Sequence, residues 1–244
     1  MAPDYAELHC LSNFSFLRGA SHPQELVEQA AALGYRALAI TDECSVAGVV
    51  RAWQAAREYK LHLLIGSEFR LEDGLRLVLL ATDRQGYGQL CRLITRGRRQ
   101  APKGQYRLTR NDLATALDHC LALWLAGTET PAEEGGWMSA QFPGRCWIAV
   151  ELLADGEERQ RQQRLQALGR KLNLPLVACG DVHMHVRKRR ALQDTLTAIR
   201  LRRPLGTTGR ALFANGERHL RPRDVLAEIY PPAMLAESLR IAGG

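Results

Sequence analysis

Strand-like and helix-like runs alternate along this chain, and that order limits the possible folds more than any other feature. Seven short apolar runs, mostly ended by polar residues or glycine, have the character of strands covered on both faces. They lie at residues 6–11, 37–41, 61–69, 75–81, 120–127, 146–152 and 174–182. Helical patterns separate most of them, at residues 22–34, 45–59, 86–97, 110–118, 157–172 and 190–200.

Repeated strand–helix units predict an α/β fold with a parallel sheet, and seven strands favour a closed or nearly closed barrel. Only the third and fourth strands are joined by a tight turn, at residues 70–74. An open, doubly wound sheet is the alternative. The sequence has neither the GxGxxG nor the GxxxxGK[ST] pattern, which argues against the common nucleotide-binding folds.

Composition adds limits on size and compartment. With 244 residues and 46% hydrophobic content, the chain can bury one substantial core. It has no apolar run near the ~20 residues that span a bilayer and no signal-peptide pattern at its start, so we expect a cytoplasmic protein. Its six cysteines form no CxxC pair, so we expect neither a cysteine zinc site nor disulfides.

The last part of the chain differs from the rest. Residues 1–200 carry the alternating pattern, whereas residues 201–244 begin with a loop-rich stretch that shows only short helices. We therefore predict a barrel domain over residues 1–200, followed at 201–244 by the start of a connection to a further domain.

Basic residues gather in two places, within a net charge of +7. The two groups are Arg96, Arg98, Arg99 and Lys103 in the first, and Arg187, Lys188, Arg189 and Arg190 in the second. Such patches fit contact with nucleic acid or with an acidic protein surface, and a solvated arginine-rich face is the plain alternative.

Polar residues that bind metals follow several of the predicted strands. His9, Glu68 and the pair Asp181 and His183 stand at or after the ends of the first, third and last strands, and Glu43 follows the second. In a barrel of parallel strands these ends meet on one face, where active sites form. Imidazoles and carboxylates from separate strands are ligands for zinc, manganese or iron.

Several longer motifs resemble one family. The segments "ELHCLSNFSFLRGASHPQELVEQAAALGYRALAITDECSVAGVV", "IGSEF", "LVLLATDRQGYGQLCRLIT", "QFPGRCWIAVEL" and "VACGDVHMHVRKRRALQDTLTAIR" occur in the same order as in the PHP (polymerase and histidinol phosphatase) domain of bacterial DNA polymerase III alpha subunits. The similarity covers about residues 5–200, and the spellings "TDECS" and "LFANGERHLRP" are closest to the error-prone branch. The resemblance implies a PHP-type distorted (β/α)7 barrel, with residues 201–244 leading toward a polymerase palm domain.

The metal-binding pattern of that family is only partly present. Metal-binding members use about nine ligand positions for up to three metals, and four of these positions match here: His9, Glu68, Asp181 and His183. The other five are substituted, by Leu11, Arg18, Glu43, Arg76 and Thr128. Leucine cannot coordinate a metal, and arginine keeps a positive charge at every relevant pH. We therefore expect Arg18 and Arg76 to form ion pairs with the acidic residues in place of metals, with no catalytic residue and no bound manganese or zinc.

The resemblance also implies a role for the full-length protein, that of a DNA-directed DNA polymerase acting past damaged bases in damage-induced (SOS) mutagenesis. Its polymerase chemistry would use Mg²⁺ in a domain absent from this chain. The implied partners are the other polymerase domains, ImuB-like and ImuA-like accessory proteins, the sliding clamp and primed DNA. Two alternatives stay open for the barrel: an active metal-dependent phosphoesterase (a 3′–5′ exonuclease or pyrophosphatase), and a metal-free nucleic-acid-binding barrel.

Overall fold

A seven-stranded sheet forms the centre of the structure, a computed structural model that describes residues 2–114, 117–127 and 132–243. The strands are β1 (Ala6–Glu7), β2 (Ala37–Ile40), β3 (His62–Arg70), β4 (Arg76–Ala81), β5 (Cys120–Trp124), β6 (Cys146–Glu151) and β7 (Leu176–Cys179), and they lie in the sheet in chain order. Just beyond β1 and β7, backbone hydrogen bonds run from Val182 N to His9 O (2.9 Å) and from Leu11 N to Val182 O (2.8 Å). These bonds form an isolated bridge between the segments that follow the first and last strands, so the sheet forms a nearly closed barrel, as predicted.

Strand direction differs from the prediction at one strand. β1, β2 and β3 are parallel, as are β5, β6 and β7, but β4 is antiparallel to both of its neighbours. The tight turn after β3 reverses the chain, with Leu71 N bonded to Leu75 O and with Gly74 at φ +94°. The prediction of a parallel sheet is therefore wrong at β4, because a hairpin forces the strand that follows it to run backward.

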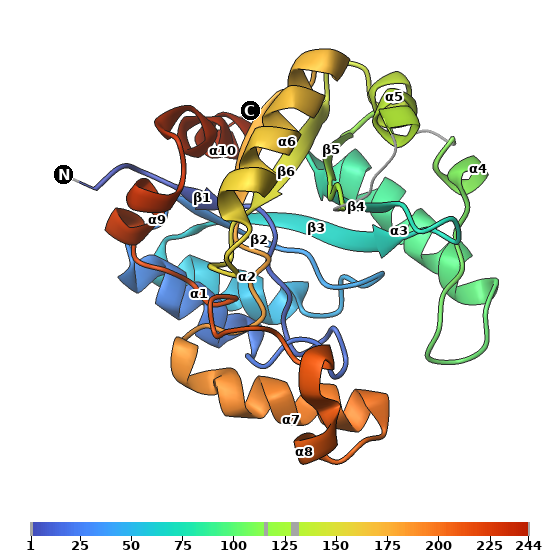
Figure 1. Ribbon diagram of the computed structural model, residues 1–244. Coiled ribbons are helices and arrows are strands. Elements are labelled where there is room, and N and C mark those ends of the chain that lie inside the picture. The colour runs from blue at the N-terminus through green and yellow to red at the C-terminus, as the bar shows by residue number, and fades with distance from the viewer. Residues whose placement is uncertain (1, 115–116, 128–131, 244) are drawn as a thin grey trace.

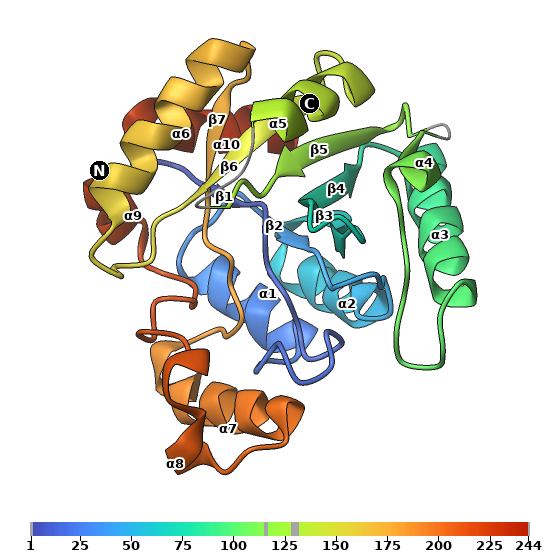
Figure 2. The same ribbon diagram turned by 45° about the vertical axis from the view of Figure 1, so that its right-hand side comes forward.

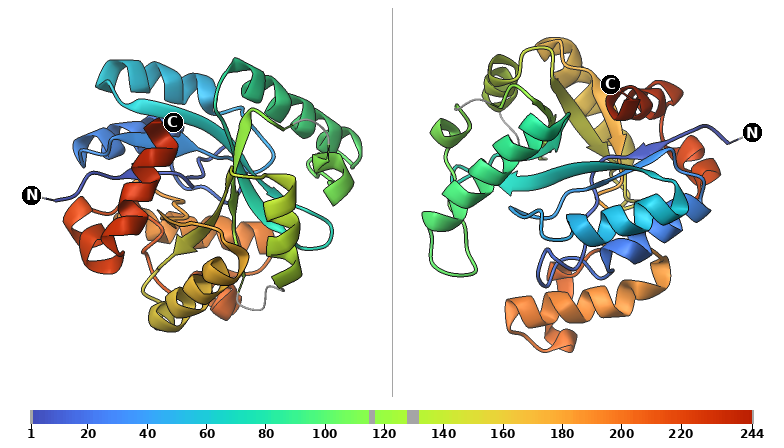
Figure 3. Two further views of the ribbon diagram at one scale, coloured as in Figure 1. Left: turned by 90° about the horizontal axis from the view of Figure 1, so that it is seen from above. Right: turned by 180° about the vertical axis from the view of Figure 1, so that it is seen from behind.

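Helices surround the sheet (Figures 1 and 3). The long helices are α1 (Pro23–Ala32), α2 (Val49–Tyr59), α3 (Arg84–Arg99), α5 (Ala132–Gln141), α6 (Glu158–Leu172), α7 (Arg190–Leu201) and α10 (Pro232–Gly243). The shorter ones are α4 (Arg110–Leu113), η1 (Arg187–Arg189), α8 (Leu205–Thr208), η2 (Gly209–Ala211) and α9 (Arg223–Ile229). In the described residues no helix has the length and apolar character needed to cross a membrane.

The core has two parts, because side chains of a strand alternate between its faces. One cluster lies inside the barrel and contains Val78, Leu80, Trp147 and Val177. The other lies between the sheet and the helices, and unites strand residues such as Leu77 with Leu26 of α1 and Leu90 of α3. The parity of a strand residue therefore tells whether it points into the barrel.

The C-terminal segment packs on the barrel. Ile241 and Ala242 of α10 belong to the inner cluster, so α10 covers one end of the barrel. The helices α7 and α8 lie at the opposite end of the molecule (Figures 1 and 2). The predicted domain boundary after residue 200 stays a prediction, but residues beyond it supply part of the core.

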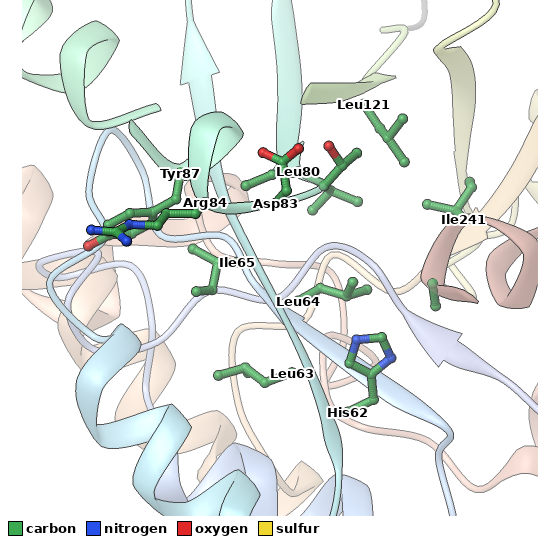
Figure 4. Close-up of a pocket in the computed structure, with 13 residues that line it drawn as sticks. His62, Leu63, Leu64, Ile65, Leu80, Asp83, Arg84, Tyr87, Leu121 and Ile241 are labelled. Carbon is green, nitrogen blue, oxygen red and sulfur yellow. The ribbon is translucent and has the colours of Figure 1, made fainter. Parts of the chain in front are cut away.

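A hollow of about 350 Å³ lies at the α10 end of the barrel (Figure 4). Apolar side chains make up much of its wall, among them Leu63, Leu64 and Ile65 of β3. The carboxylate of Asp83, also in the wall, caps α3 by accepting from Gly86 N at 2.8 Å. No metal-binding cluster of three or more side chains is found at this hollow in the described residues.

Candidate functional site

The candidate site lies where the parallel strands end, at the other end of the barrel from α10. Three of its side chains follow from strand parity. Glu68 shares the inner face of β3 with Leu64, Arg76 shares that of β4 with Val78, and Glu151 shares that of β6 with Trp147. Glu68 and Glu151 lie near the carboxyl ends of their strands, and Arg76 opens the antiparallel β4, so all three side chains point into the same space.

His9 reaches this space through a break in alternation. Leu8 belongs to the inner cluster and Cys10 to the outer one. In a regular strand, residues two positions apart point to the same face, so the alternation is broken between Leu8 and Cys10. The carboxylate of Glu7 accepts from His9 N at 3.0 Å and from Gly180 N at 2.9 Å. Glu7 thus fastens the end of β1 to the end of β7 directly beneath the site.

Arg18 is carried by the loop that follows, and a buried carboxylate organises that loop. Asp42 accepts from the backbone N and the hydroxyl of both Ser12 and Ser15, at 2.7–3.1 Å. Gly19 is required because a Cβ there would lie 2.0 Å from Ser12 O. The loop is therefore tightly folded and points Arg18 at the strand ends.

Glu68 is the centre of the cluster, with three cationic side chains around one carboxylate. Arg18 Nη2 lies 3.0 Å from Oε2, Arg76 Nη2 lies 3.1 Å from Oε1, and His9 Nε2 lies 3.2 Å from Oε2. Burial opposes ionisation, but these three neighbours hold the pKa of Glu68 well below its usual range. Arg18 also pairs with Glu43, whose Oε1 accepts from Tyr106 Oη at 3.0 Å. Glu68 is thus an ionised, fully engaged carboxylate.

The imidazole of His9 lies between two carboxylates. Nδ1 is 2.9 Å from Glu151 Oε1, and Nε2 is bonded to Glu68 on the other side. Burial disfavours the charged ring, but the hydrogen bonds and charges of Glu151 and Glu68 outweigh it and raise the pKa of His9 to about 8. At neutral pH both ring nitrogens therefore carry protons, and neither offers a lone pair to a metal.

Asp181 and His183 form the remaining side of the cluster. Asp181 pairs with Arg218, and its Oδ1 lies 3.0 Å from His183 Nε2. Burial, reinforced by the charge of Arg18, lowers the pKa of His183 to about 3, so the ring is neutral. Phe213 packs edge-on against this ring, and the guanidinium of Arg218 stacks on Phe213 at 4.2 Å from the ring centre.

The charges of these described residues balance. Four carboxylates, Glu43, Glu68, Glu151 and Asp181, face three guanidinium groups, Arg18, Arg76 and Arg218, and the imidazolium of His9. Buried carboxylates need such partners, since an unpaired buried charge is strongly unfavourable. Divalent cations could neutralise these carboxylates, but here arginine and histidine side chains do so.

The closest set of possible metal ligands is His9, Glu151 and Asp181, whose ligand atoms lie within 4.8 Å of one another. The chemistry of this set does not suit a metal ion, because His9 is protonated and Asp181 already pairs with a guanidinium. Three arginines in the same cluster add repulsion for a cation.

The sequence-predicted positions are largely brought together. His9, Arg18, Glu43, Glu68, Arg76, Asp181 and His183 form one cluster, with Arg18 and Arg76 turned toward the carboxylates as the ion-pair hypothesis requires. Leu11 is fully buried, and Thr128 lies outside the described residues. His185 is bonded to Ser21 at 2.8 Å and lies outside the cluster.

Sequence reasoning missed Glu151 and Arg218. Glu151 ends β6 on the same face as Trp147 and Ala149, so applying the strand parity to β6 would have found it. Arg218 stands in a loop with no periodic pattern, and the strand ends that it meets precede it by up to about two hundred residues. No local sequence signal therefore places Arg218 near them. Both residues complete the charge balance.

Most of the predicted basic surface is engaged within the chain. Arg98 donates to Cys44 O at 3.1 Å and stacks on Tyr106, and Arg190 pairs with Asp194 at 2.9 Å. Three more have acidic partners: Arg96 with Asp112, Arg187 with Glu217, and Arg189 with Glu25. Of the eight named residues, all within the described ranges, only Arg99, Lys103 and Lys188 show no ion pair or side-chain hydrogen bond.

Comparisons with known proteins agree with this fold. Residues 7–136, more than half of the chain, match the model of the PHP domain. The chain is 64% identical over 239 residues to an error-prone DNA polymerase of Methylococcus capsulatus, and 61% identical to one of Pseudomonas fluorescens. Each alignment covers 98% of this chain but only 23% of the relative, so the chain spans about a quarter of those proteins.

A solved structure gives the same fold at low sequence identity. A protein of Bifidobacterium adolescentis, described as a metal-dependent phosphoesterase, superposes with a TM-score of 0.57 at 16% identity. The match covers 75% of this chain and 89% of that protein. From its barrel, its cluster at the strand ends and its match to the family model, this chain belongs to the PHP domain family.

Proposed function

We propose that this chain is the PHP domain of an error-prone translesion DNA polymerase, and that it serves there as a metal-free, catalytically inactive scaffold and interaction domain. The observation that carries the proposal is the placement of Arg18 and Arg76 on Glu68, at 3.0 and 3.1 Å. These two arginines place fixed positive charges against Glu68, the glutamate that matches a ligand position of the family pattern, and they occupy the space that a metal would need. Without metals, the cluster has no metal-bound water to act as the nucleophile.

The proposal extends to the full-length protein. Identity above 60% to error-prone DNA polymerases supports template-directed DNA synthesis, in parts of the protein outside this chain. Those parts would carry the Mg²⁺ chemistry and bind primed DNA. We further propose a cytoplasmic protein that acts in damage-induced mutagenesis with ImuB-like and ImuA-like accessory proteins and the sliding clamp.

The second candidate is a metal-dependent phosphoesterase, such as a 3′–5′ exonuclease or pyrophosphatase. Its support is the close approach of His9, Glu151 and Asp181. Against it stands the protonated state of His9 at neutral pH. Deprotonating His9 above pH 8 would free one ligand, so this candidate predicts metal binding and activity that rise steeply with pH.

Hydrolysis of a 3′-labelled oligonucleotide with added manganese separates the two candidates. The matched variant is Leu11→His, Arg18→Asp and Arg76→His together, which restores three ligand types of the family pattern. The scaffold proposal expects no hydrolysis by the unchanged chain between pH 7 and 9, and metal binding only by the variant. Manganese-dependent hydrolysis by the unchanged chain, abolished by Glu68→Gln, would overturn it.

A further inference from the structure

The two halves of β3 have different neighbours in the sheet. Residues 62–65 pair with residues 37–40 of β2, whereas residues 66–70 pair with residues 76–80 of β4. Within the part of the chain that the structure describes, no strand pairs with residues 62–65 on the side opposite β2. β3 and β4 therefore separate toward the α10 end of the barrel, where both line the hollow of about 350 Å³ (Figure 4).

The first half of β3 is consequently a strand edge that faces this hollow. Residues of a parallel pair direct their backbone N–H and C=O groups alternately to either side, so about half of residues 62–65 turn these groups away from β2. Such an edge is a template for a further strand, and proteins commonly pair or cover it. At ~3.3 Å per residue, four residues make an edge ~13 Å long.

Apolar side chains flank the edge without being fully covered. Leu63, Leu64 and Ile65 are half-buried, whereas the next four residues of β3 are buried. Leu121 of β5, across the hollow, is also half-buried. Ile65 lines the hollow but packs against neither of the two core clusters. A segment placed in the hollow would remove these apolar groups from water, which favours its docking.

The hollow also lies at the end of the last helix. Ile241 and Ala242 of α10 form part of its wall, and α10 ends at Gly243. The chain spans about a quarter of the length of its error-prone polymerase relatives. A segment that continues from α10 starts beside the hollow, and this tether gives it a high local concentration there.

We propose that the segment directly after residue 244 in the full-length polymerase enters this hollow as an extended strand and pairs with residues 62–65 of β3. The inference rests on the proposed function in one respect, that the chain is part of a longer polymerase. Hydrogen bonds to the strand edge supply attraction, and the apolar walls select the side chains that enter. The added strand fills the separation between β3 and β4 and fastens the barrel to the domain that follows.

Cross-linking in the full-length polymerase identifies the occupant. A photoreactive benzoylphenylalanine replaces Tyr87, which is 37% exposed in the wall of the hollow, and mass spectrometry maps the product. The control carries the same group in place of Tyr59, which is 41% exposed on α2 and does not line the hollow. We expect only the Tyr87 probe to react with the ~20 residues after position 244, a length several times that of the edge.

Hydrogen exchange tests the strand pairing itself. The amides of residues 62–65 that point away from β2 should exchange about tenfold or more slowly in the full-length polymerase than in the 244-residue chain. Ile65→Lys places a charge in the hollow and should abolish this difference. Val50→Lys, at an exposed apolar residue of α2 outside the hollow, is the control and should preserve it. Thermal unfolding shows that each variant is folded.

Cross-linking to a second copy, to a more distant part of the polymerase or to no segment would overturn the inference. Equal exchange in the full-length protein and the 244-residue chain would overturn it too, as would slow exchange that persists in folded Ile65→Lys. Neither readout involves metal or hydrolysis. Manganese-dependent hydrolysis by the unchanged chain would therefore refute the scaffold proposal and leave the strand pairing standing.

Discussion

Arg18 Nη2 lies 3.0 Å from Glu68 Oε2, and the same guanidinium also pairs with Glu43. Glu68 is only 2% exposed, so its charge depends on protein groups rather than on water. In the family pattern both positions serve metal ions. Here the pair connects the loop that carries Arg18 to the ends of β2 and β3. It is therefore a structural contact.

Replacing Arg18 by leucine should destabilise the fold. The change leaves Glu43 without its cation and removes one of three cations from Glu68, at a cost of about 2–3 kcal/mol in the free energy of unfolding. Urea denaturation at pH 7 measures it. Arg36→Leu is the control, since Arg36 pairs with Asp4 on the surface and should leave the free energy unchanged within error. An Arg18→Leu variant as stable as the unchanged chain would contradict the structural role.

The protonation of His9 predicts how stability varies with pH. The pKa of His9 is about 8 in the folded protein against 6.5 when unfolded, so the folded state binds the proton more tightly. This contribution, about 2 kcal/mol, is fully present below pH 6.5 and is lost as pH rises through 8. Urea denaturation at pH 6 and pH 9 should show this decrease as a difference between the unchanged chain and His9→Gln, because the lowered pKa of His183 acts in the opposite direction in both proteins. Equal pH dependence in the two proteins would rule out His9 as the cause.

Glu151 should control the charge of His9. Glu151 accepts from Nδ1 at 2.9 Å and, with Glu68, keeps the ring protonated. Glu151→Gln removes one negative charge and one ionic hydrogen bond, so the pKa of His9 should fall. Imidazole ¹H–¹³C NMR titration measures this directly, with Glu237→Gln on α10 as a control distant from the ring. An unchanged His9 pKa in Glu151→Gln would show that this hydrogen bond is absent in solution.

Gly180 should be intolerant of a side chain. A Cβ at this position would lie 2.4 Å from Glu7 Oε2, the carboxylate that fastens β1 to β7. Gly180→Ala should therefore destabilise the protein by about 2 kcal/mol, through overpacking and displaced hydrogen bonds. Gly136→Ala in α5 is the control, because open space surrounds that position and alanine favours a helix. Similar thermal unfolding of the two variants would argue against the role of Glu7.

The sequence pattern predicted the barrel and most of the cluster for a physical reason. Apolar alternation places residues such as Glu68 and Asp181 at the strand ends, and closure of the barrel then brings them together. The reversed direction of β4 was not predicted, because the repeated strand–helix units suggested a parallel sheet. Its cause is the hairpin before β4, which the turn at residues 70–74 does indicate.

Residues beyond the regular pattern could not be placed from sequence. Arg218 reaches Asp181 through the path of an irregular segment, which depends on tertiary packing and not on local periodicity. The same holds for Gln193 and Arg200 of α7, which line one hollow together with the cluster, because their position depends on how α7 packs. Local patterns specify which way a strand residue points, but not where a distant loop returns.

The central claim is that side-chain cations replace metal ions at the strand ends. The most direct test is the metal content of the chain after incubation with Mn²⁺ or Zn²⁺ at pH 7 and removal of free ion, measured by mass spectrometry of the elements. The account predicts no stoichiometric metal in the unchanged chain, and bound metal in the Leu11→His, Arg18→Asp, Arg76→His variant. One or more ions per unchanged chain, lost on Glu68→Gln, would contradict it.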